Sequence, residues 1–519
     1  MKKSIQLLSL LLIITLFISS CDPSKKTSKN DNGQIEFTIL QTNDVYEIGT
    51  LEGGAVGGMA RVAQVRQELA AQNPNILSIM AGDFLNPSVI GTLKHEGKRI
   101  KGKQMVDVMN VAGIDLVTFG NHEFDLKEEE LLARINESKF QWVVSNTYHK
   151  KGNKIQPFQQ NGKDIPAYWV KEFQDADGTT VKVGFIGICL NSNKPEFVHY
   201  DYPADNKFMK FKETYEKIKN KVDIVIGLTH QAIADDKLLA AEFPNIPLII
   251  GGHEHHNMKH KIGNVIITKA DANAKTAYIH RFKFNKKGKK VSFTSELKNI
   301  DKTVKSEAKT AAAVTKWQNI ANKVLRISGI DPDATVVDLA EPIDATEHIT
   351  RHKPSVIGKI IVESISQACP TAQGAILNTG SIRIDDVLRG RITEYDVVRI
   401  LPFGGGMLVA EMSGELLLQA LHAGVVENVG NGGYFALSNI TYDGENRIGE
   451  VNGSAIEIER KYKIAVPTFL LSGLESNLSF FKKDSPQIFE ITDPKTDAQA
   501  DIRIAVINFL KNNSIPKAE

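Results

Sequence analysis

A pattern that occurs five times in the first half of this chain restricts its fold more than any other feature. Each time, a short apolar run ends directly in residues that can bind a metal ion. The runs are residues 37–40, 76–81, 115–119, 222–228 and 247–250. The polar endings after them contain Asp44, Asp83, Asn121 with His122, His230, and His253 with His255. Apolar runs of this kind are typical of strands that helices cover on both faces.

The segments between these runs have the apolar spacing of helices, at residues 59–71, 103–111, 128–135 and 211–219. Glycines stand directly before Asp83, Asn121 and His253. We interpret them as sharp turns that direct the next side chain into a shared crevice. The sequence therefore predicts an α/β fold, a layered sandwich in which the polar endings meet at one edge of the sheets.

The donor atoms in these endings indicate a metal centre. A mixture of Asp, Asn and His favours Zn, Mn, Fe, Co or Ni over an all-oxygen Mg or Ca site. Two such ions about 3.5–4 Å apart can share a carboxylate and hold both sides of an in-line displacement at phosphorus. Asp83, alone after its strand, is the natural bridging group. A solvated or core side chain explains any single histidine, but it does not explain five endings together.

Taken together, the motifs resemble those of a known enzyme family. They are Asn43-Asp44, Gly82-Asp83, Gly120-Asn121-His122-Glu123-Phe124-Asp125, Thr229-His230 and Gly251-Gly252-His253-Glu254-His255. Over residues 35–298 they resemble the calcineurin-like metallophosphoesterase domain of the bacterial 5′-nucleotidase family. The resemblance implies an α/β/β/α sandwich that binds two divalent metal ions, such as Zn, Mn or Co.

The resemblance also implies a role for each residue. Asp44, Asp83 and His255 serve one metal, and Asp83, Asn121, His230 and His253 serve the other. His122 is the catalytic histidine beside the scissile phosphate, and Asp125 orients it. One motif departs from the usual family form, because Tyr46 stands where Asp-x-His is common. Since a neutral phenol is a poor ligand, the first metal is expected to bind weakly or to be completed by water. Some family members carry the same Asn-Asp-Val-Tyr variant.

The second half begins after a charged segment. Residues 299–334 are predicted to be a linker, with an exposed hinge helix at residues 308–325 whose apolar positions include Val314, Trp317 and Ala321. Strands and helices then alternate over residues 335–510. The pattern predicts helices at residues 355–368 and 415–422, strands at 375–377 and 407–412, and a helix that begins at Thr393.

Loops of this half carry residues that suit a nucleotide. The guanidinium of Arg383 presents a planar fork to phosphate oxygens, and Phe403 and Phe469 offer aromatic faces. The loops resemble the C-terminal α/β substrate-binding domain of the same nucleotidases. The resemblance implies phosphate or ribose contacts for Arg351 and Arg383, base or ribose contacts for Asn378, and base stacking for Phe403 and Phe469. Glu475 would bind ribose hydroxyls, although Gly473-Leu474-Glu475 replaces the family's Gly-Gly-Asp.

The N-terminus is predicted to be a targeting segment. Residues 1–21 resemble a bacterial lipoprotein signal peptide in which Cys21 is lipidated, and residues 22–34 form a polar tether. The alternatives are a plain secretory signal or an uncleaved anchor. Cys189 and Cys369 are expected to be buried thiols, with a disulfide as the open alternative.

The formal charge of +2 is accounted for by Lys2 and Lys3, so no nucleic-acid partner is expected. No obligate protein partner is evident either.

The expected function is an exported phosphoesterase, held in the cell envelope by a lipid anchor in a bacterial membrane. It would convert nucleoside 5′-monophosphates or related nucleotides to nucleoside and phosphate. The alternatives are a UDP-sugar or cyclic-nucleotide phosphodiesterase on the same site, or a non-catalytic nucleotide-binding lipoprotein.

Overall fold

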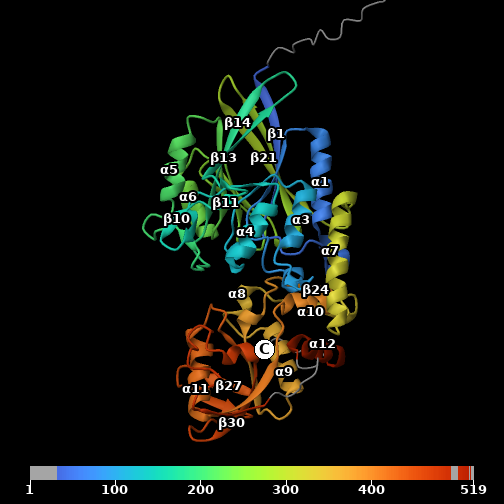
Figure 1. The fold of residues 1–519 in the computed structure, drawn as a ribbon, viewed down its shortest axis with the longest axis vertical. Helices are drawn as coiled ribbons and strands as arrows, with labels where there is room; N and C mark the ends of the chain where they lie inside the picture. Colours follow the sequence, from blue (N-terminus) through green and yellow to red (C-terminus); the bar gives the residue numbers. More distant parts are fainter. Residues whose placement is uncertain (1–31, 493–500, 514, 516–519) are drawn as a thin grey trace, which may run out of the picture.

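The computed structural model describes residues 32–492, 501–513 and 515. These residues form an N-terminal and a C-terminal domain that are joined by a long helix (Figure 1). The predicted signal peptide, the lipidation of Cys21 and most of the tether lie outside the described residues. Within the described part of the chain, no helix has both the length and the apolar character needed to span a membrane.

The N-terminal domain is built on a pair of mixed sheets. The first has the order β21 (Lys290–Asn299), β20 (Thr276–Asn285), β1 (Gln34–Thr42), β4 (Ile76–Met80), β7 (Leu116–Val117) and β8 (Gln141–Trp142). The second has the order β13 (Tyr168–Gln174), β14 (Thr180–Cys189), β16 (Ile224–His230), β17 (Leu248–Gly252), β19 (Val265–Lys269) and β18 (Met258–Ile262). Strands β1, β4 and β7 are parallel to one another, as are β14, β16 and β17. Their carboxyl ends therefore reach a common edge of each sheet.

An apolar core holds the two sheets face to face. Phe37 of β1 stacks on Phe173 of β13 across this core, with ring centroids 4.7 Å apart. Ile79 of the first sheet and Ile226 of the second belong to the same buried cluster. Each fully buried side chain of this size contributes about 1.5–3 kcal/mol.

Helices cover the outer faces of both sheets. They are α1 (Met59–Gln72), α3 (Lys103–Ala112) and α4 (Glu128–Glu137) on the first sheet, and α5 (Met209–Ile218) and α6 (Ile233–Glu242) on the second. The resulting α/β/β/α sandwich confirms the predicted architecture. Cys189 and Cys369 are both buried thiols, as expected.

The joining helix α7 (Ala308–Ile327) lies along the side of the N-terminal domain (Figure 1). Its Val314, Trp317 and Ala321 side chains are buried, and the helix packs on α1 and α3. The indole of Trp317 donates a hydrogen bond to Asp107 Oδ2 at 3.0 Å. The predicted helix is therefore exposed on one face only, because its apolar stripe is covered by the helices of the first domain. Its role as a hinge stays a prediction.

The C-terminal domain is a three-layer α/β/α unit. Its sheet has the order β26 (Phe435–Ser438), β23 (Gly374–Asn378), β30 (Lys461–Pro467), β25 (Met407–Ser413) and β31 (Ile488–Thr492). Helices α9 (Val356–Ala368) and α12 (Ile502–Asn512) pack on one face, and α11 (Gly414–His422) packs on the other. Alternate strand residues serve the two faces, since Leu377 joins the α9 side and Ile376 joins the α11 side.

The helix predicted to begin at Thr393 is α10 (Glu394–Ile400). The Thr393 side chain accepts a hydrogen bond from the Asp396 N–H, and the Asp396 side chain accepts one from the Thr393 N–H. This reciprocal capping fixes the start of the helix. The other elements predicted for this domain coincide with α9, β23, β25 and α11.

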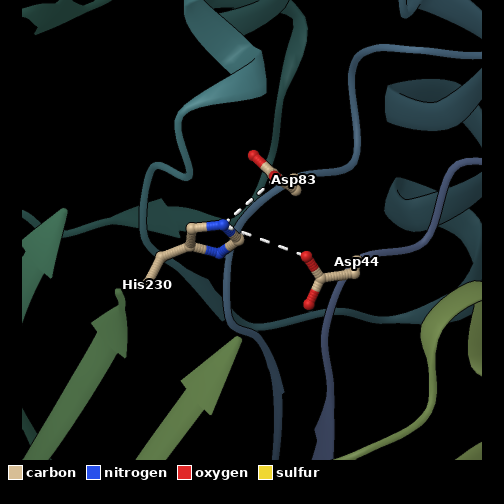
Figure 2. A group of neighbouring side chains, drawn as sticks. All are labelled: Asp44, Asp83 and His230. Atoms are coloured by element: carbon tan, nitrogen blue, oxygen red, sulfur yellow. Dashed lines mark ion pairs between the residues drawn. The ribbon is translucent and has the colours of Figure 1, made fainter. Parts of the chain in front are cut away.

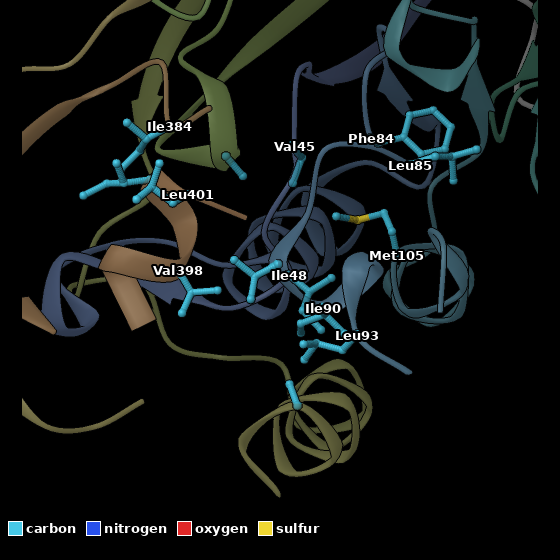
Figure 3. Close-up of a cluster of buried hydrophobic side chains, with 14 of the residues drawn as sticks. Val45, Ile48, Phe84, Leu85, Ile90, Leu93, Met105, Ile384, Val398 and Leu401 are labelled. Carbon is cyan, nitrogen blue, oxygen red and sulfur yellow. The ribbon is translucent and has the colours of Figure 1, made fainter. Parts of the chain in front are cut away.

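The apolar core of the first domain continues into the second (Figure 3). Val45 and Ile48 of the N-terminal domain belong to one buried cluster with Ile384 and Leu401 of the C-terminal domain. Polar contacts flank this cluster. The Tyr395 hydroxyl of α10 donates a hydrogen bond to the buried Glu47 at 2.6 Å, and Lys275 pairs with Asp386. The interface places the loop after β23 against the carboxyl edge of the first domain's sheets.

Candidate active site

Three of the predicted metal ligands meet at the carboxyl edge of the sheets (Figure 2). Ligand atoms of Asp44, Asp83 and His230 all lie within 4.8 Å of one another. His230 Nε2 is 3.1 Å from Asp83 Oδ2 and 3.9 Å from Asp44 Oδ1. All three side chains are buried. Two carboxylates and an imidazole in this arrangement form a donor set suited to a divalent transition metal.

Unpartnered atoms beside this group support a metal site. His230 Nδ1 donates to the Ala81 carbonyl at 2.7 Å, so Nε2 faces the carboxylates. Within the described residues, buried Asn121 Oδ1 has no hydrogen-bond partner, and buried His230 Nε2 faces Asp83 Oδ2 at 3.1 Å without the geometry of a hydrogen bond. Buried polar atoms seldom stay unsatisfied, and both are ordinary ligand atoms for Zn, Mn or Co. The residues present therefore fit a bound divalent ion.

The electrostatics of the histidines follow from these carboxylates. Burial lowers the pKa of His230, but Asp83 and Asp44 outweigh it and raise the pKa to about 9. The negative site thus favours positive charge, which a metal ion also supplies. Burial and the nearby His230 lower the pKa of His253 to about 4. His253 is therefore neutral near pH 7, as a metal ligand must be. Its ring packs edge-on against His230, with centroids 5.5 Å apart.

Tyr46 lies among the ligands that the family resemblance assigns to the first metal. Its hydroxyl is 2.9 Å from His255 Nε2 and donates to Asp83 Oδ2 at 3.3 Å. His255 Nε2 is in turn 3.7 Å from Asp44 Oδ1. Burial and the charge of Asp83 raise the pKa of Tyr46 well above its ordinary value. The side chain is thus a neutral phenol that acts as a hydrogen-bonding group.

The glycines before the ligands differ in what they do. Gly82 has a left-handed φ of +79°, as the sharp-turn interpretation requires. At Gly120 and Gly252 that interpretation is wrong, because neither glycine has a left-handed φ. After Gly252, the left-handed φ of 90° belongs to His253 itself. These two glycines provide space instead. A Cβ on Gly120 would lie 2.2 Å from Asp83 Oδ1, and one on Gly252 would lie 2.3 Å from the Ala81 carbonyl oxygen.

The Gly120–Asp125 motif turns as a short helix, η2 (His122–Asp125). His122 Nδ1 is 2.6 Å from Asp125 Oδ2, and Asn86 and Asn193 donate hydrogen bonds to the same carboxylate. The His122 N–H donates to Asp83 Oδ1 at 2.8 Å. Burial lowers the pKa of His122, but Asp83 and Asp125 outweigh it and raise the pKa above its usual value. The structure therefore brings together the histidine and the carboxylate predicted to orient it.

Glu123 lies in the same motif, and we assigned it no role from the sequence. Its Oε1 accepts hydrogen bonds from the Phe84 and Leu85 N–H groups at 2.8 and 3.1 Å. Its Oε2 accepts from Asp83 N at 2.9 Å and from Gly120 N at 2.6 Å. One buried carboxylate thus fixes the backbone from Asp83 to Leu85 and at Gly120. The sequence signal was an acidic residue inside an apolar turn, but three of its four partners lie about 40 residues away in the chain.

Replacing Glu123 by Gln is expected to destabilise the N-terminal domain by about 1–3 kcal/mol. Whichever oxygen becomes an amide NH₂ leaves a pair of buried N–H groups facing a donor. Urea unfolding of the variant measures the loss, and Glu129→Gln on the exposed side of the same segment is the matched control. Equal stability of Glu123→Gln and Glu129→Gln would show that the carboxylate does not organise this turn.

All six predicted substrate residues line a single cavity of the C-terminal domain, with a volume of about 620 Å³. They are Arg351, Asn378, Arg383, Phe403, Phe469 and Glu475. The side chains of Phe403 and Phe469 are 61% and 49% exposed. Asn378 Nδ2 donates to Glu475 Oε2 at 2.7 Å. The volume lies in the range of small-molecule sites.

Arg383 connects this pocket to the metal edge. It lines the cavity of about 620 Å³ and also a narrow space between the domains that Tyr46 borders. Its positive charge is close enough to His122 to oppose the rise in the pKa of that imidazole. The end of a bound ligand that contacts Arg383 would therefore face His122 and the carboxylates.

Known proteins match this arrangement in both domains. Residues 37–257 match the family model described as calcineurin-like phosphoesterase, and residues 334–483 match the one described as 5′-nucleotidase, C-terminal domain. A 5′-nucleotidase of Vibrio cholerae is 22% identical over 493 residues, which cover 84% of this chain and 85% of that protein. The trifunctional nucleotide phosphoesterase protein YfkN of Bacillus subtilis is 25% identical over 88% of this chain, which matches only 32% of that longer protein.

A solved structure shares the fold over nearly the whole length. The 5′-nucleotidase precursor of Thermus thermophilus aligns with 92% of this chain and 96% of its own at a TM-score of 0.68, with 20% sequence identity. Both domains of the fold, and their order, are thus accounted for. With the phosphoesterase model on the first domain and the nucleotidase model on the second, the chain belongs to the 5′-nucleotidase family and is a metal-dependent phosphoester hydrolase.

Proposed function

We propose that this chain is an exported two-metal phosphoesterase that hydrolyses nucleoside 5′-monophosphates, or closely related nucleotides, to nucleoside and phosphate. The observation that carries this proposal is the position of Arg383, which borders both the aromatic pocket and the metal edge. A nucleotide has its base and its phosphate at opposite ends, and this arrangement provides a site for each. Export rests on the sequence of residues 1–21, with Cys21 as the lipid anchor in the cell envelope.

The pocket residues would bind the nucleoside end. Phe403 and Phe469 present their faces to a flat base, and stacking of this kind is tolerant of base identity. Glu475, which accepts a hydrogen bond from Asn378, would accept hydrogen bonds from ribose hydroxyls. Arg351 and Arg383 would hold the phosphate, because guanidinium groups match pairs of phosphate oxygens.

The first domain would act on the phosphate. Asp44, Asp83 and His255 would hold one divalent ion, and Asp83, Asn121, His230 and His253 the other. Bound ions of this type supply a nucleophile derived from water and neutralise phosphoryl charge. His122 would stabilise charge on the phosphoryl oxygens and donate a proton to the departing ribose oxygen. Asp125 favours the charged imidazole by accepting from Nδ1.

Phe469→Ala is expected to raise KM for AMP by about 10–100-fold and to change kcat little. Loss of one stacking face costs about 1–3 kcal/mol of binding, while the phosphate end stays in place. Steady-state kinetics measure the split, and Phe489→Ala is the control, since Phe489 is also 49% exposed but does not line the pocket. An unchanged KM in Phe469→Ala would remove Phe469 from the base site.

A substrate panel tests the proposed function. The metal-loaded chain is given nucleoside 5′-monophosphates, a UDP-sugar, a cyclic nucleotide and a sugar phosphate, and product release is compared. We expect the highest kcat/KM on a 5′-monophosphate. A preference for the UDP-sugar or cyclic nucleotide would select the phosphodiesterase alternative. Nucleotide binding with no turnover on any member would select the non-catalytic lipoprotein.

A further inference from the structure

His255 makes a contact that none of the sequence motifs predicts. Its Nδ1 lies 2.5 Å from Oδ2 of Asp385, a residue of the C-terminal domain that is 130 positions away. The other ring nitrogen, Nε2, faces the metal edge, where it is 3.7 Å from Asp44 Oδ1 and 2.9 Å from the Tyr46 hydroxyl. The ring is thus held between a carboxylate of one domain and the ligand cluster of the other.

Asp385 is itself fixed in position. Its Oδ1 accepts a hydrogen bond from the Glu347 N–H at 2.6 Å, and its backbone has a left-handed φ of 40°, which Asp tolerates better than most residues. Because Oδ1 is occupied by the backbone, Oδ2 is left to receive the proton on His255 Nδ1. Nδ1 is thus held by Asp385, and Nε2 is directed at the metal edge.

We propose that Asp385 is a positioning residue for the metal centre, acting on the ligand His255 from across the domain interface. The inference rests on the proposed role of His255 in the first metal site. A carboxylate behind a metal-bound imidazole fixes its tautomer and orientation and strengthens it as a ligand. The first site therefore reaches its full affinity only when the second domain is docked against it.

The loop that carries Asp385 also contributes to the substrate pocket. Asn378, Ser381 and Arg383 of the same loop line the nucleotide pocket, and Asp385 follows Arg383 by two positions. One short segment thus contacts both the substrate cavity and a metal ligand. The affinity of the first metal site is set in part by the domain that binds the substrate.

A simple interdomain ion pair is the competing explanation, and the chain offers a matched control for it. Asp386, the next residue, pairs with Lys275 across the same interface and does not reach His255. Asp386→Ala therefore loosens the interface without altering the ligand. Co²⁺ binding to the full chain is measured by calorimetry, and the visible absorption of the bound Co²⁺ reports on the ligand geometry.

We expect Asp385→Ala to weaken Co²⁺ binding by about 10–100-fold, the usual cost of losing such a partner, and to change the absorption spectrum. Asp386→Ala should keep the affinity and spectrum of the unaltered chain. In a His255→Ala background, Asp385→Ala should cause little further loss, since both act through one ring.

Equal Co²⁺ affinities for Asp385→Ala and the unaltered chain would overturn this inference and leave the proposed function standing. Equal losses in Asp385→Ala and Asp386→Ala would overturn it in favour of the ion pair. If the unaltered chain takes up no Co²⁺, the metal centre is wrong, and the proposed function fails together with this inference.

Discussion

Replacing His122 by Ala is expected to lower kcat by about 10²–10⁴-fold while the metal content stays that of the unaltered chain. The imidazole is held by Asp125 at 2.6 Å and is not part of the buried ligand group. Its loss therefore removes a positioned proton donor, which typically contributes this much to the rate. Steady-state turnover of AMP and metal analysis of the same preparation measure both quantities.

A histidine elsewhere on the N-terminal domain controls for general damage. His260 lies on β18, outside the ligand group, and the His260→Ala variant should retain full turnover. If His122→Ala loses metal and activity together, His122 is a ligand and its assigned catalytic role is wrong.

Asp83→Asn is expected to have a still larger effect, because it should remove both metal and activity. Its carboxylate accepts hydrogen bonds from the His122 N–H and the Tyr46 hydroxyl, and its Oδ2 lies 3.1 Å from His230 Nε2. A neutral amide of the same shape keeps the packing but loses the charge that holds a divalent ion. Mutation of a residue that only supports a ligand already lowers metal affinity by about 10–100-fold. Loss of a bridging ligand should therefore lower it by more than about 100-fold.

Metal titration and phosphate release test this variant side by side. Asp107→Asn, at the partly exposed contact with Trp317 and Lys316, is the matched control and should bind metal normally. An Asp83→Asn protein that retains the full metal content would show that Asp83 does not bridge the centre.

The sequence predicted most of this fold because its signals are local. The apolar run at residues 37–40 lies in β1, and the run at 222–228 continues into β16. Residues 37–40 and 224–228 are buried between layers, so their lack of charge is visible in the sequence alone. The helix at residues 308–325 was also found, but its burial was not. A stripe such as Val314 and Trp317 does not say whether a partner surface covers it.

The candidate site divides in the same way. The ligand types after each strand are readable, because a strand end followed by Asp or His is a local pattern. The partners that fix those ligands are not readable. Glu123 holds the backbone of Asp83, and Asp385 holds His255, through contacts that depend on sheet order and domain docking. Tyr46 was noticed as a departure, but its hydrogen bonds to Asp83 and His255 needed the assembled structure.

Phosphate release from AMP by the metal-loaded chain, before and after chelation, is the most direct test of the account. We predict multiple turnovers with Mn²⁺, Zn²⁺ or Co²⁺, loss of turnover when the ions are removed, and recovery when they are returned. A metal-loaded chain that binds AMP but releases no phosphate would contradict the account.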